Sequence, residues 1–217
     1  MCGRFAQFTN IHIIKAKYNI DEIQMEFEST YNIAPGSFIP VIVQRNKKNR
    51  KLTKMVWGLH PSWKNDSKNK YDLINIRAET LVQKDTFQKN FQKRRCLIVA
   101  DGFYEWDTKS KVPYYIYYRN KNPMVLAGIW EDKDQEEDET CSIITTRANK
   151  KISEIHGRMP VIVPEKYVGY WLDVEVFNRE KLKKLFYPIN SDLIRYDRVS
   201  RLVNNPKNDS PQCIEPV

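Results

Sequence analysis

The sequence predicts an α+β fold, a single domain built around a curved, mostly antiparallel sheet or open barrel with flanking helices. Strand-like segments outnumber helical ones, two pairs of them are joined by short polar turns, and the helical segments are interspersed among strands. Helices placed in this way among antiparallel hairpins are typical of α+β domains. The 217 residues contain no visible internal repeat and are enough to bury a sizeable core. We therefore expect one domain over residues 1–217.

Five stretches are expected to supply the strands. Residues 38–59 and 112–130 each contain two β-rich runs around a polar turn, basic in the first and Asn-Lys-Asn-Pro in the second. These patterns predict two hairpins. Residues 94–102 hold a short continuous apolar run that ends at Asp-Gly, which is typical of a buried strand. Strands over 140–148 and 192–203 complete the predicted set.

Helices are expected over 78–94, 164–172 and 178–186, the second with a proline in its first turn. The acidic run over 131–139 is most simply a solvated hairpin loop. Residues 204–217 are polar and contain proline, so this C-terminal tail is expected to lie on the surface or to be mobile.

The charge balance of the chain is basic. Lys and Arg total 36 against 27 Asp and Glu, which gives a formal net charge of +9. This excess suits a polyanionic partner such as nucleic acid. A generally basic surface explains the charge equally well.

The four cysteines lie far apart and form no C-x-x-C pair, which indicates neither a zinc cluster nor a disulfide framework. We therefore expect no metal and no cofactor, and structural roles for Cys96, Cys141 and Cys213. No apolar run reaches membrane-spanning length, and no secretory segment precedes Cys2. The predicted location is the cytoplasm, with reduced thiols, and the nucleoid when the protein is bound to DNA.

Cys2 directly follows Met1, which sets it apart from the other cysteines. Once Met1 is removed, Cys2 carries a free α-amine and a thiol on adjacent carbons. No internal cysteine offers this pair of nucleophiles. Cys2 is thus a candidate for chemistry that requires a terminal position.

Several short polar stretches lie where strands are expected to end. Taken singly, Asn75 is explained as a turn residue, Glu105 as the outward residue of an alternating strand, and His156 as a satisfied histidine. Tryptophans such as Trp57 and Trp63 are more often core than ligand platforms. The stretches are "YNIAPG" (31–36), "WGLHPSW" (57–63), "LINIRAET" (73–80), "ADGFYEW" (100–106) and "EIHGRMPVIV" (154–163).

Taken together, these stretches resemble the SOS response-associated peptidase (SRAP) family, whose members shield abasic sites in single-stranded DNA. The resemblance runs in order and nearly in spacing from "MCGRF" at the start to "VNNPKNDSPQCI" near the end. It covers essentially the whole chain. Six motifs in register, anchored on a cysteine at position 2, make it highly specific.

The resemblance implies a role for each residue that matches a family motif. Cys2 corresponds to the cysteine that becomes covalently joined to the abasic site, and Asn75 to an asparagine that senses the abasic sugar. Glu105 corresponds to a glutamate that stabilises the reacting sugar, and His156 to a histidine in sugar recognition and proton transfer. These four are the predicted catalytic residues.

The resemblance also implies a set of DNA contacts, in which arginines line the groove while a proline and a tryptophan pack against the strand. One departure is Lys64, where many members have an apolar or aromatic residue, which implies a smaller aromatic wedge. The predicted DNA-binding residues are Arg4, Asn32, Pro35, Trp63, Arg77, Thr145 and Arg158.

The chemistry explains why a terminal cysteine is needed. An abasic deoxyribose exists partly as a ring-opened aldehyde, which an amine converts to an imine with loss of water. The thiol of Cys2 then adds to the imine carbon and closes a five-membered thiazolidine. An α-amine has a pKa of about 7.7–8.0 against about 10.4 for lysine, so a useful neutral fraction exists at neutral pH. Glu105 and His156 can move the required protons.

We therefore expect an abasic-site processing protein of the DNA damage response that acts as a monomer on single-stranded DNA. It would cross-link through Cys2 in a lyase-type reaction, with hydrolase activity limited mainly to self-processing of Met1. The alternatives are a cysteine peptidase and a non-catalytic single-stranded DNA-binding module. Replacing Cys2 with serine separates the three, since only a pure binder is unaffected.

Overall fold

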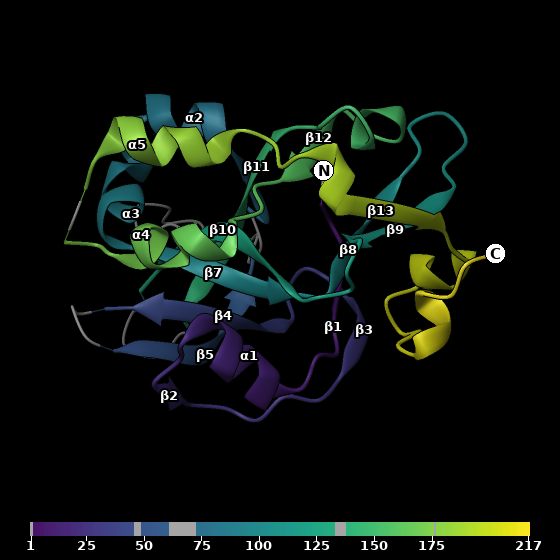
Figure 1. Cartoon of the computed structure of the whole chain (residues 1–217), viewed down its shortest axis with the longest axis horizontal. Coiled ribbons are helices and arrows are strands. Elements are labelled where there is room, and N and C mark those ends of the chain that lie inside the picture. Colours follow the sequence, from purple (N-terminus) through teal and green to yellow (C-terminus); the bar gives the residue numbers. More distant parts are fainter. Residues whose placement is uncertain (1, 46–48, 61–72, 133–137, 176) are drawn as a thin grey trace.

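Two sheets form the centre of the structure, a computed structural model that describes residues 2–45, 49–60, 73–132, 138–175 and 177–217. The smaller sheet has five strands in the order β13-β9-β8-β1-β3. Its β1 strand therefore lies between β8 and β3 (Figure 1). The strands are β1 (Phe5–Gln7), β3 (Thr30–Ile33), β8 (Gly102–Trp106), β9 (Pro113–Tyr118) and β13 (Ile194–Arg198).

The larger sheet has eight strands, seven of them in the order β12-β11-β10-β7-β4-β5-β2, with β6 paired to β11. A parallel pairing of β5 with β11, through Thr140 and Val56, closes five strands into a ring. The predicted α+β class is thus confirmed. The strands are β2 (Glu22–Ile23), β4 (Phe38–Gln44), β5 (Arg50–Trp57), β6 (Asn75–Arg77), β7 (Arg95–Ala100), β10 (Met124–Glu131), β11 (Thr140–Arg147) and β12 (Arg158–Pro160).

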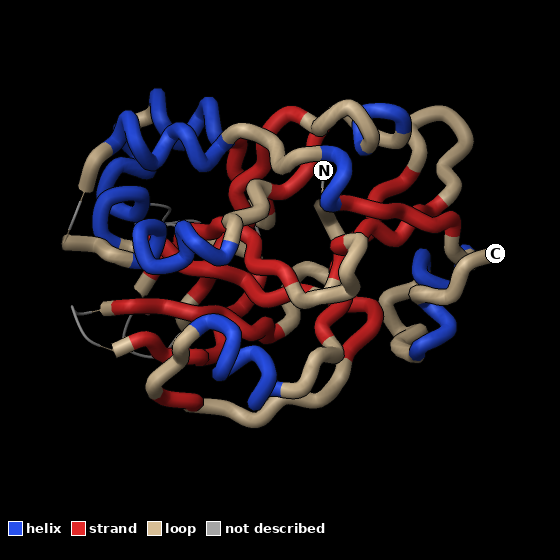
Figure 2. Tube along the Cα trace, in the orientation of Figure 1, coloured by secondary structure: helices blue, strands red, loops and turns tan. Residues whose placement is uncertain are grey.

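Short helices lie around the strands, as the coloured tube in Figure 2 shows. The helices α2 to α5 gather near one another, whereas α1 lies apart from them beside β4 and β5 (Figure 1). All five pack into the same apolar cluster against the larger sheet. No helix in the described ranges is long and apolar enough to cross a membrane. The helices are α1 (Ile11–Tyr18), α2 (Ala78–Gln83), α3 (Gln88–Lys93), α4 (Val168–Leu172) and α5 (Arg179–Lys183).

Single 3-10 turns join many of these elements. Two of them, η6 and η7, shape the C-terminal tail, which is pinned back onto the domain by a bridge between Val199 and Pro216. The turns are η1 (Asp85–Phe87), η2 (Ile152–Glu154), η3 (Glu165–Tyr167), η4 (Lys184–Phe186), η5 (Ser191–Leu193), η6 (Arg201–Asn204) and η7 (Pro211–Cys213).

The predicted hairpin over 112–130 is wrong, although both of its strands exist. β9 pairs with β8 and β13, whereas β10 pairs with β7 and β11. Every residue of β10 is buried, while β9 keeps half-buried tyrosines. A strand that is apolar on both faces is stable only where both faces are buried. The position of β10 within the larger sheet meets that condition. Residues 119–123 are therefore a crossing between sheets.

The helix predicted over 78–94 is broken into α2, η1 and α3. Lys84 has an extended backbone, with φ −92° and ψ 126°. In one straight helix Leu81 and Phe87 would face directions about 120° apart. The break allows both Leu81 and Phe87 to be buried in the same core.

Helix α1 was not predicted from the sequence. Its first turn is capped by the Asn10 side chain, which accepts a hydrogen bond from the His12 backbone N–H at 2.8 Å. It ends at Asn19, which has a left-handed backbone with φ 50°. Only Ile14 and Tyr18 of the helix are buried. Two buried positions are too few to produce a clear helical periodicity of apolar residues in the sequence.

Three apolar clusters hold these layers together. The first joins the helices to the larger sheet, and the second fills the space between the two sheets, where it contains Cys2, Phe5, Trp57 and Phe103. The third, which includes Ala6 and Tyr104, lies on the other face of the smaller sheet. The C-terminal residues Val199 and Val203 belong to it, so β8 is covered on both faces.

Candidate active site

The four predicted catalytic residues come from four separate parts of the fold. Cys2 lies three residues before the start of β1, and Glu105 lies on β8; both strands belong to the smaller sheet. Asn75 begins β6 in the larger sheet, and His156 lies in the loop that leads into β12. The contacts described below bring these segments together where the two sheets meet.

Strand pairing brings the N-terminal segment that contains Cys2 alongside Glu105. Phe5 pairs with Phe103 across the β1–β8 ladder, and the Tyr104 N–H donates to the Arg4 carbonyl at 2.9 Å. Continuing this antiparallel register puts Gly3, the neighbour of Cys2, opposite Glu105. Phe103 and Glu105 alternate with Tyr104, so they share the face of β8 that looks toward the cluster containing Cys2.

Both side chains are almost fully enclosed, with 0% of Cys2 and 2% of Glu105 exposed. Burial raises the pKa of the Cys2 thiol, and the charge of Glu105 raises it further. Burial also raises the pKa of Glu105, to about 7. A carboxyl group with that pKa is present in both protonation states at neutral pH and can act as an acid or as a base.

His156 lies next to the same carboxylate. Its Nδ1 is 3.8 Å from a carboxylate oxygen of Glu105 and 3.1 Å from the Arg158 backbone N–H that donates to it. Burial lowers the pKa of His156, which favours the neutral imidazole. A neutral ring that accepts the Arg158 N–H at Nδ1 carries its proton at Nε2.

Asn75 joins the larger sheet to the N-terminal segment. Its Nδ2 donates to the Cys2 carbonyl at 2.7 Å. Its Oδ1 is buried and has no hydrogen-bond partner among the residues that the structure describes. Buried side-chain oxygens are nearly always hydrogen-bonded, so this acceptor is suited to a bound hydroxyl group.

A second group of predicted residues lies on adjacent strands of the larger sheet. Arg77 pairs with Thr145 in the β6–β11 ladder. The Arg158 guanidinium donates to the Thr145 carbonyl at 2.6 Å and makes a two-pronged ion pair with Glu79, at 2.8 and 3.0 Å. Arg77 is exposed, while Arg158 is half-buried. Arg77, Thr145 and Arg158 therefore form one polar edge beside Asn75 and His156.

Arg4 and Asn32 face a different neighbour, the C-terminal tail. The Arg4 Nη1 donates to the Asn32 side-chain oxygen at 2.7 Å and to the Val203 carbonyl at 2.9 Å. Asn32 is only 3% exposed. Pro35 is exposed in the turn after β3. Trp63, the remaining predicted DNA contact, lies outside the described residues, as does Lys64.

Two residues of the sequence motifs, Glu79 and Trp106, were not predicted from the sequence to take part in the site. Glu79 stands in the "IRAET" motif, but nothing local indicates that its partner is Arg158, which is 79 residues away. Trp106 ends the "ADGFYEW" motif, and its indole N–H donates to the Asn204 side chain at 2.8 Å. In both cases the motif marks the residue, and only the tertiary structure supplies its partner.

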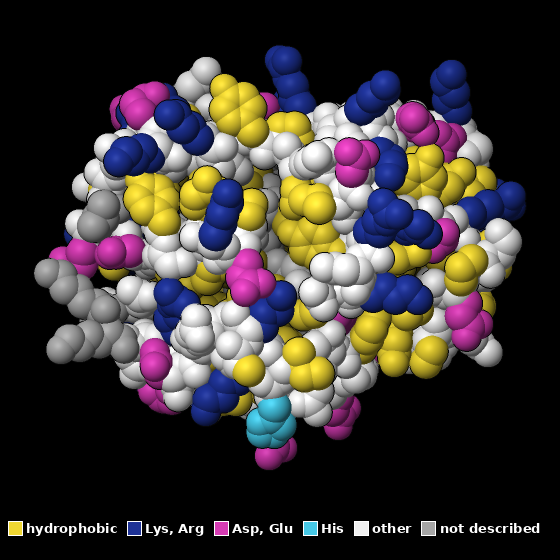
Figure 3. All heavy atoms as spheres, in the orientation of Figure 1, with side chains coloured by type: hydrophobic (Ala, Val, Ile, Leu, Met, Phe, Trp, Pro, Cys, Tyr) yellow, Lys and Arg dark blue, Asp and Glu magenta, His cyan; other side chains and the backbone are white. Residues whose placement is uncertain are grey.

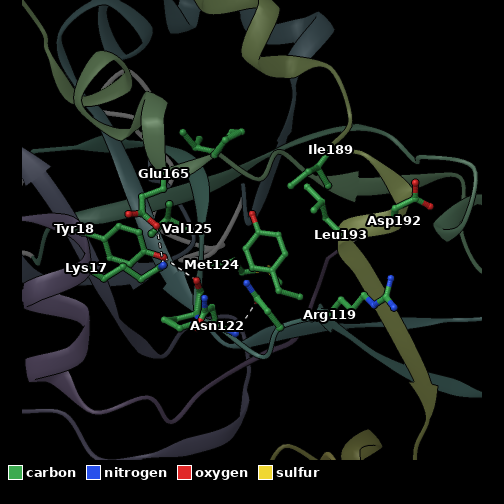
Figure 4. A pocket seen from close by; sticks show the side chains of 15 residues that line it. Lys17, Tyr18, Arg119, Asn122, Met124, Val125, Glu165, Ile189, Asp192 and Leu193 are labelled. Carbon is green, nitrogen blue, oxygen red and sulfur yellow. Dashed lines mark hydrogen bonds and ion pairs between the residues drawn. The ribbon is translucent and has the colours of Figure 1, made fainter.

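A cavity of about 730 Å³ lies elsewhere, lined by Tyr118, Met124, Val163, Leu193 and their neighbours (Figure 4). A Lys17–Glu165 ion pair of 2.8 Å stands at its edge. None of the predicted site residues lines it. In the described part of the chain, no three His, Cys, Asp or Glu side chains gather as a metal site would require.

Comparison with known proteins identifies the family of the chain. The family model described as SOS response associated peptidase (SRAP) matches residues 1–206. The chain belongs to the SRAP family. This confirms the family to which the sequence motifs pointed.

Among curated SRAP relatives, the abasic site processing protein YoqW of Bacillus subtilis is 40% identical over 223 residues and is aligned over 99% of both chains. The abasic site processing protein HMCES of Rattus norvegicus is 34% identical over 231 residues, which cover 87% of this chain and 65% of the rat protein. A crystal structure of a protein from Bacteroides thetaiotaomicron superposes with a TM-score of 0.86 at 24% identity over all of both chains. That likeness establishes the SRAP protein's fold.

Proposed function

We propose that this SRAP protein processes abasic sites in DNA by forming a covalent thiazolidine cross-link through Cys2. The observation that carries the proposal is the meeting of Cys2, Asn75, Glu105 and His156 at the junction of the two sheets. The names of the relatives YoqW and HMCES, as abasic site processing proteins, support the same substrate.

The reaction requires cleavage of the Met1–Cys2 bond, because an amide nitrogen cannot form an imine. The freed amine attacks the ring-opened aldehyde, and the resulting carbinolamine expels water to leave a C=N bond. The thiol S–H then adds across that bond, with sulfur bonding to carbon and the proton going to nitrogen. Holding both nucleophiles on adjacent carbons makes the second addition intramolecular and therefore fast.

The surrounding groups fit the proton transfers of this sequence. Glu105, with its pKa near 7, can take a proton from the anomeric hydroxyl or deliver one to the leaving water. Neutral His156 lies 3.8 Å from this carboxylate, a gap that a sugar hydroxyl or a single water bridges for proton transfer. The buried Oδ1 of Asn75 can accept a hydrogen bond from a sugar hydroxyl.

We assign DNA binding to Arg77 and Arg158, with Pro35 and Trp63 packing against the strand. Thr145 is fully buried and supports this edge by accepting a hydrogen bond from Arg158. Arginines bind phosphates without regard to sequence, and apolar side chains stack on bases. A single strand is the preferred substrate, because no base has to be unpaired before the sugar can reach the site.

The environment of Cys2 favours cross-linking over general peptide hydrolysis. Catalytic cysteines owe their reactivity to cationic neighbours that lower the thiol pKa. Burial and the carboxylate of Glu105 act on Cys2 in the opposite direction. We therefore restrict the peptidase role to processing at Met1, and a cellular methionine aminopeptidase is the alternative route to the same amine.

The test is a denaturing gel of Met-processed protein incubated with a single-stranded oligonucleotide that carries one abasic site. We expect a heat-stable band at the combined mass of protein and DNA, absent with Cys2→Ser and slower to form with Glu105→Gln or His156→Ala. Cys96→Ala, which removes another buried thiol, is the matched control and should cross-link normally.

The absence of such a band, with Met1 shown to be missing by intact mass, would contradict the proposal. A Cys2→Ser protein that binds DNA and cross-links as well as the parent would assign the reaction to another residue. Turnover of unrelated peptides that depends on Cys2 would favour the peptidase instead.

A further inference from the structure

The buried side chain of Asn32 on β3 binds the backbone of the C-terminal tail. Its Nδ2 lies 3.3, 3.0 and 2.7 Å from the carbonyl oxygens of Val203, Asn205 and Asn208, respectively. The amide is thus surrounded by tail backbone, and only 3% of Asn32 is exposed. A side chain in that position has almost no surface to offer to a DNA strand.

Arg4 extends this contact to the N-terminal segment. Its Nη1 bridges the Asn32 side-chain oxygen, at 2.7 Å, and the Val203 carbonyl, at 2.9 Å. A guanidinium held by two acceptors in this way is fixed in direction. Arg4 and Val203 lie 199 positions apart in the chain, so the N-terminal and C-terminal segments meet at this bridge.

The backbone of Arg4 in turn holds Cys2. The Arg4 carbonyl accepts the Tyr104 N–H at 2.9 Å and lies 3.9 Å from the Cys2 Sγ, whose S–H points to it. On the other side, Asn75 donates to the Cys2 carbonyl at 2.7 Å. The nucleophile is therefore supported from the larger sheet by Asn75 and from the tail by Arg4.

We propose that Arg4 and Asn32 are positioning residues for Cys2, which they hold in place through the C-terminal segment 203–208, and that neither contacts DNA. This rests on the proposed cross-linking function. A reacting group displaced by about 1 Å can lose about 100-fold in rate, so loosening this support should slow the reaction of Cys2 without weakening DNA binding.

The experiment separates rate from affinity. The first-order rate of cross-linking is measured at saturating abasic oligonucleotide, and Kd is measured on the same strand with an intact nucleotide, which cannot react. Arg4→Met and Asn32→Ala are expected to slow the saturated rate by about 10- to 100-fold. Kd, its salt dependence and the final yield of cross-linked protein should stay the same. The constant yield excludes a merely unfolded fraction.

Two further variants test the hydrogen-bond geometry of Arg4 and the attachment of the tail separately. Arg4→Lys keeps the positive charge but not the planar fork, so it should be slow as well. Asp209→Ala loosens the tail at a third point, where its carboxylate accepts the Tyr31 N–H at 2.5 Å, and should also lower the rate even if Asn32→Ala fails to fold. Arg77→Gln, on the exposed edge, is the contrasting control and should raise Kd.

The proposal is overturned if Arg4→Met raises Kd and lowers the salt dependence while the saturated rate is unchanged, since Arg4 would then bind a phosphate. Unchanged rates in Arg4→Met and Asp209→Ala would overturn it too. A parent protein that binds the strand but forms no adduct would refute the proposed function, and this assignment with it, before any variant is compared.

Discussion

Glu105 is a carboxyl group on a strand that is buried on both faces. Side chains alternate between the two faces of β8. Tyr104 therefore points toward the third apolar cluster, which includes residues of the C-terminal tail, and Glu105 points toward the second, which includes Cys2. Simple alternation would allow Glu105 an outward, solvated position. In the structure Glu105 is buried instead. Its raised pKa follows from this burial.

The first prediction concerns the pH dependence of stability. Because the pKa of Glu105 rises from 4.5 to about 7 on folding, the native state holds an extra proton between these values and loses stability as pH increases through them. The isosteric, uncharged Glu105→Gln should unfold at about the same urea concentration as the parent at pH 4. At pH 8 it should be more stable, by about 2–3 kcal/mol.

Urea titrations at the two pH values check this. Glu180→Gln, at an exposed glutamate on α5, is the matched control and should show no such gain at pH 8. Equal stability of Glu105→Gln and the parent at both pH values would mean that the Glu105 carboxyl is solvated in the native state.

Glu79 is the second residue with a clear consequence. Its carboxylate occupies both Nη atoms of Arg158, at 2.8 and 3.0 Å, in the geometry that a phosphate would otherwise take. Glu79→Gln should therefore lower Kd for intact single-stranded DNA by about 3- to 10-fold at low salt, as measured by fluorescence anisotropy.

A charge-matched control distinguishes this from a general charge effect. Glu22→Gln removes one negative charge on β2, where Glu22 pairs with Lys51, and should leave Kd nearly unchanged. The gain from Glu79→Gln should also vanish when Arg158 is replaced by Gln. Weaker binding by Glu79→Gln would show that Glu79 orients Arg158 for DNA.

At the scale of elements, the Arg95 side chain on β7 donates hydrogen bonds to the C-terminal ends of two helices, α3 and α4. Its fully buried guanidinium donates to the carbonyls of Phe91 and Gln92 at the end of α3, at 2.7 and 2.8 Å. It also donates to the carbonyls of Trp171 and Asp173 at the end of α4, at 2.6 and 2.5 Å. These are carbonyls that a helix terminus leaves without partners.

Replacing Arg95 with Met should therefore leave four carbonyls without donors and lower the free energy of unfolding by about 3 kcal/mol. Urea denaturation measures this directly. Lys93→Met removes the same charge from an exposed position at the end of α3 and should change stability little. Similar losses for both variants would show that charge, and not the hydrogen bonds of Arg95, is what matters.

At the scale of the whole molecule, the basic net charge is not confined to one patch on the face that Figure 3 shows. On the face shown in Figure 3, Lys and Arg side chains alternate with Asp and Glu and with apolar side chains around a central hollow. The net charge of +9 is thus not gathered into one patch on that face. We expect DNA affinity to depend on a few directed contacts together with long-range attraction.

Salt titration tests this expectation. With two phosphates of a single strand neutralised by Arg77 and Arg158, log K should fall against log salt with a slope of about −1.4. Arg77→Gln should make that slope shallower by about 0.7. A slope near zero in the parent protein would mean that phosphates contribute little to binding.

The sequence by itself determined several of the strands and the family. Alternation and apolar runs located β4, β5, β7 and β11, because a pleated strand shows its burial in a period of two residues. The ordered motifs anchored on Cys2 identified the family, and they marked Asn75, Glu105 and His156.

Only the tertiary structure decided which strands pair and which side chains meet. β9 and β10 adjoin in sequence but lie in different sheets, because burial of whole faces outweighs the local turn. Arg4, predicted to bind DNA, bonds to a tail carbonyl 199 residues away. Local patterns report how a residue relates to its own strand or helix, whereas contacts between distant segments depend on how the faces of the whole chain pack together.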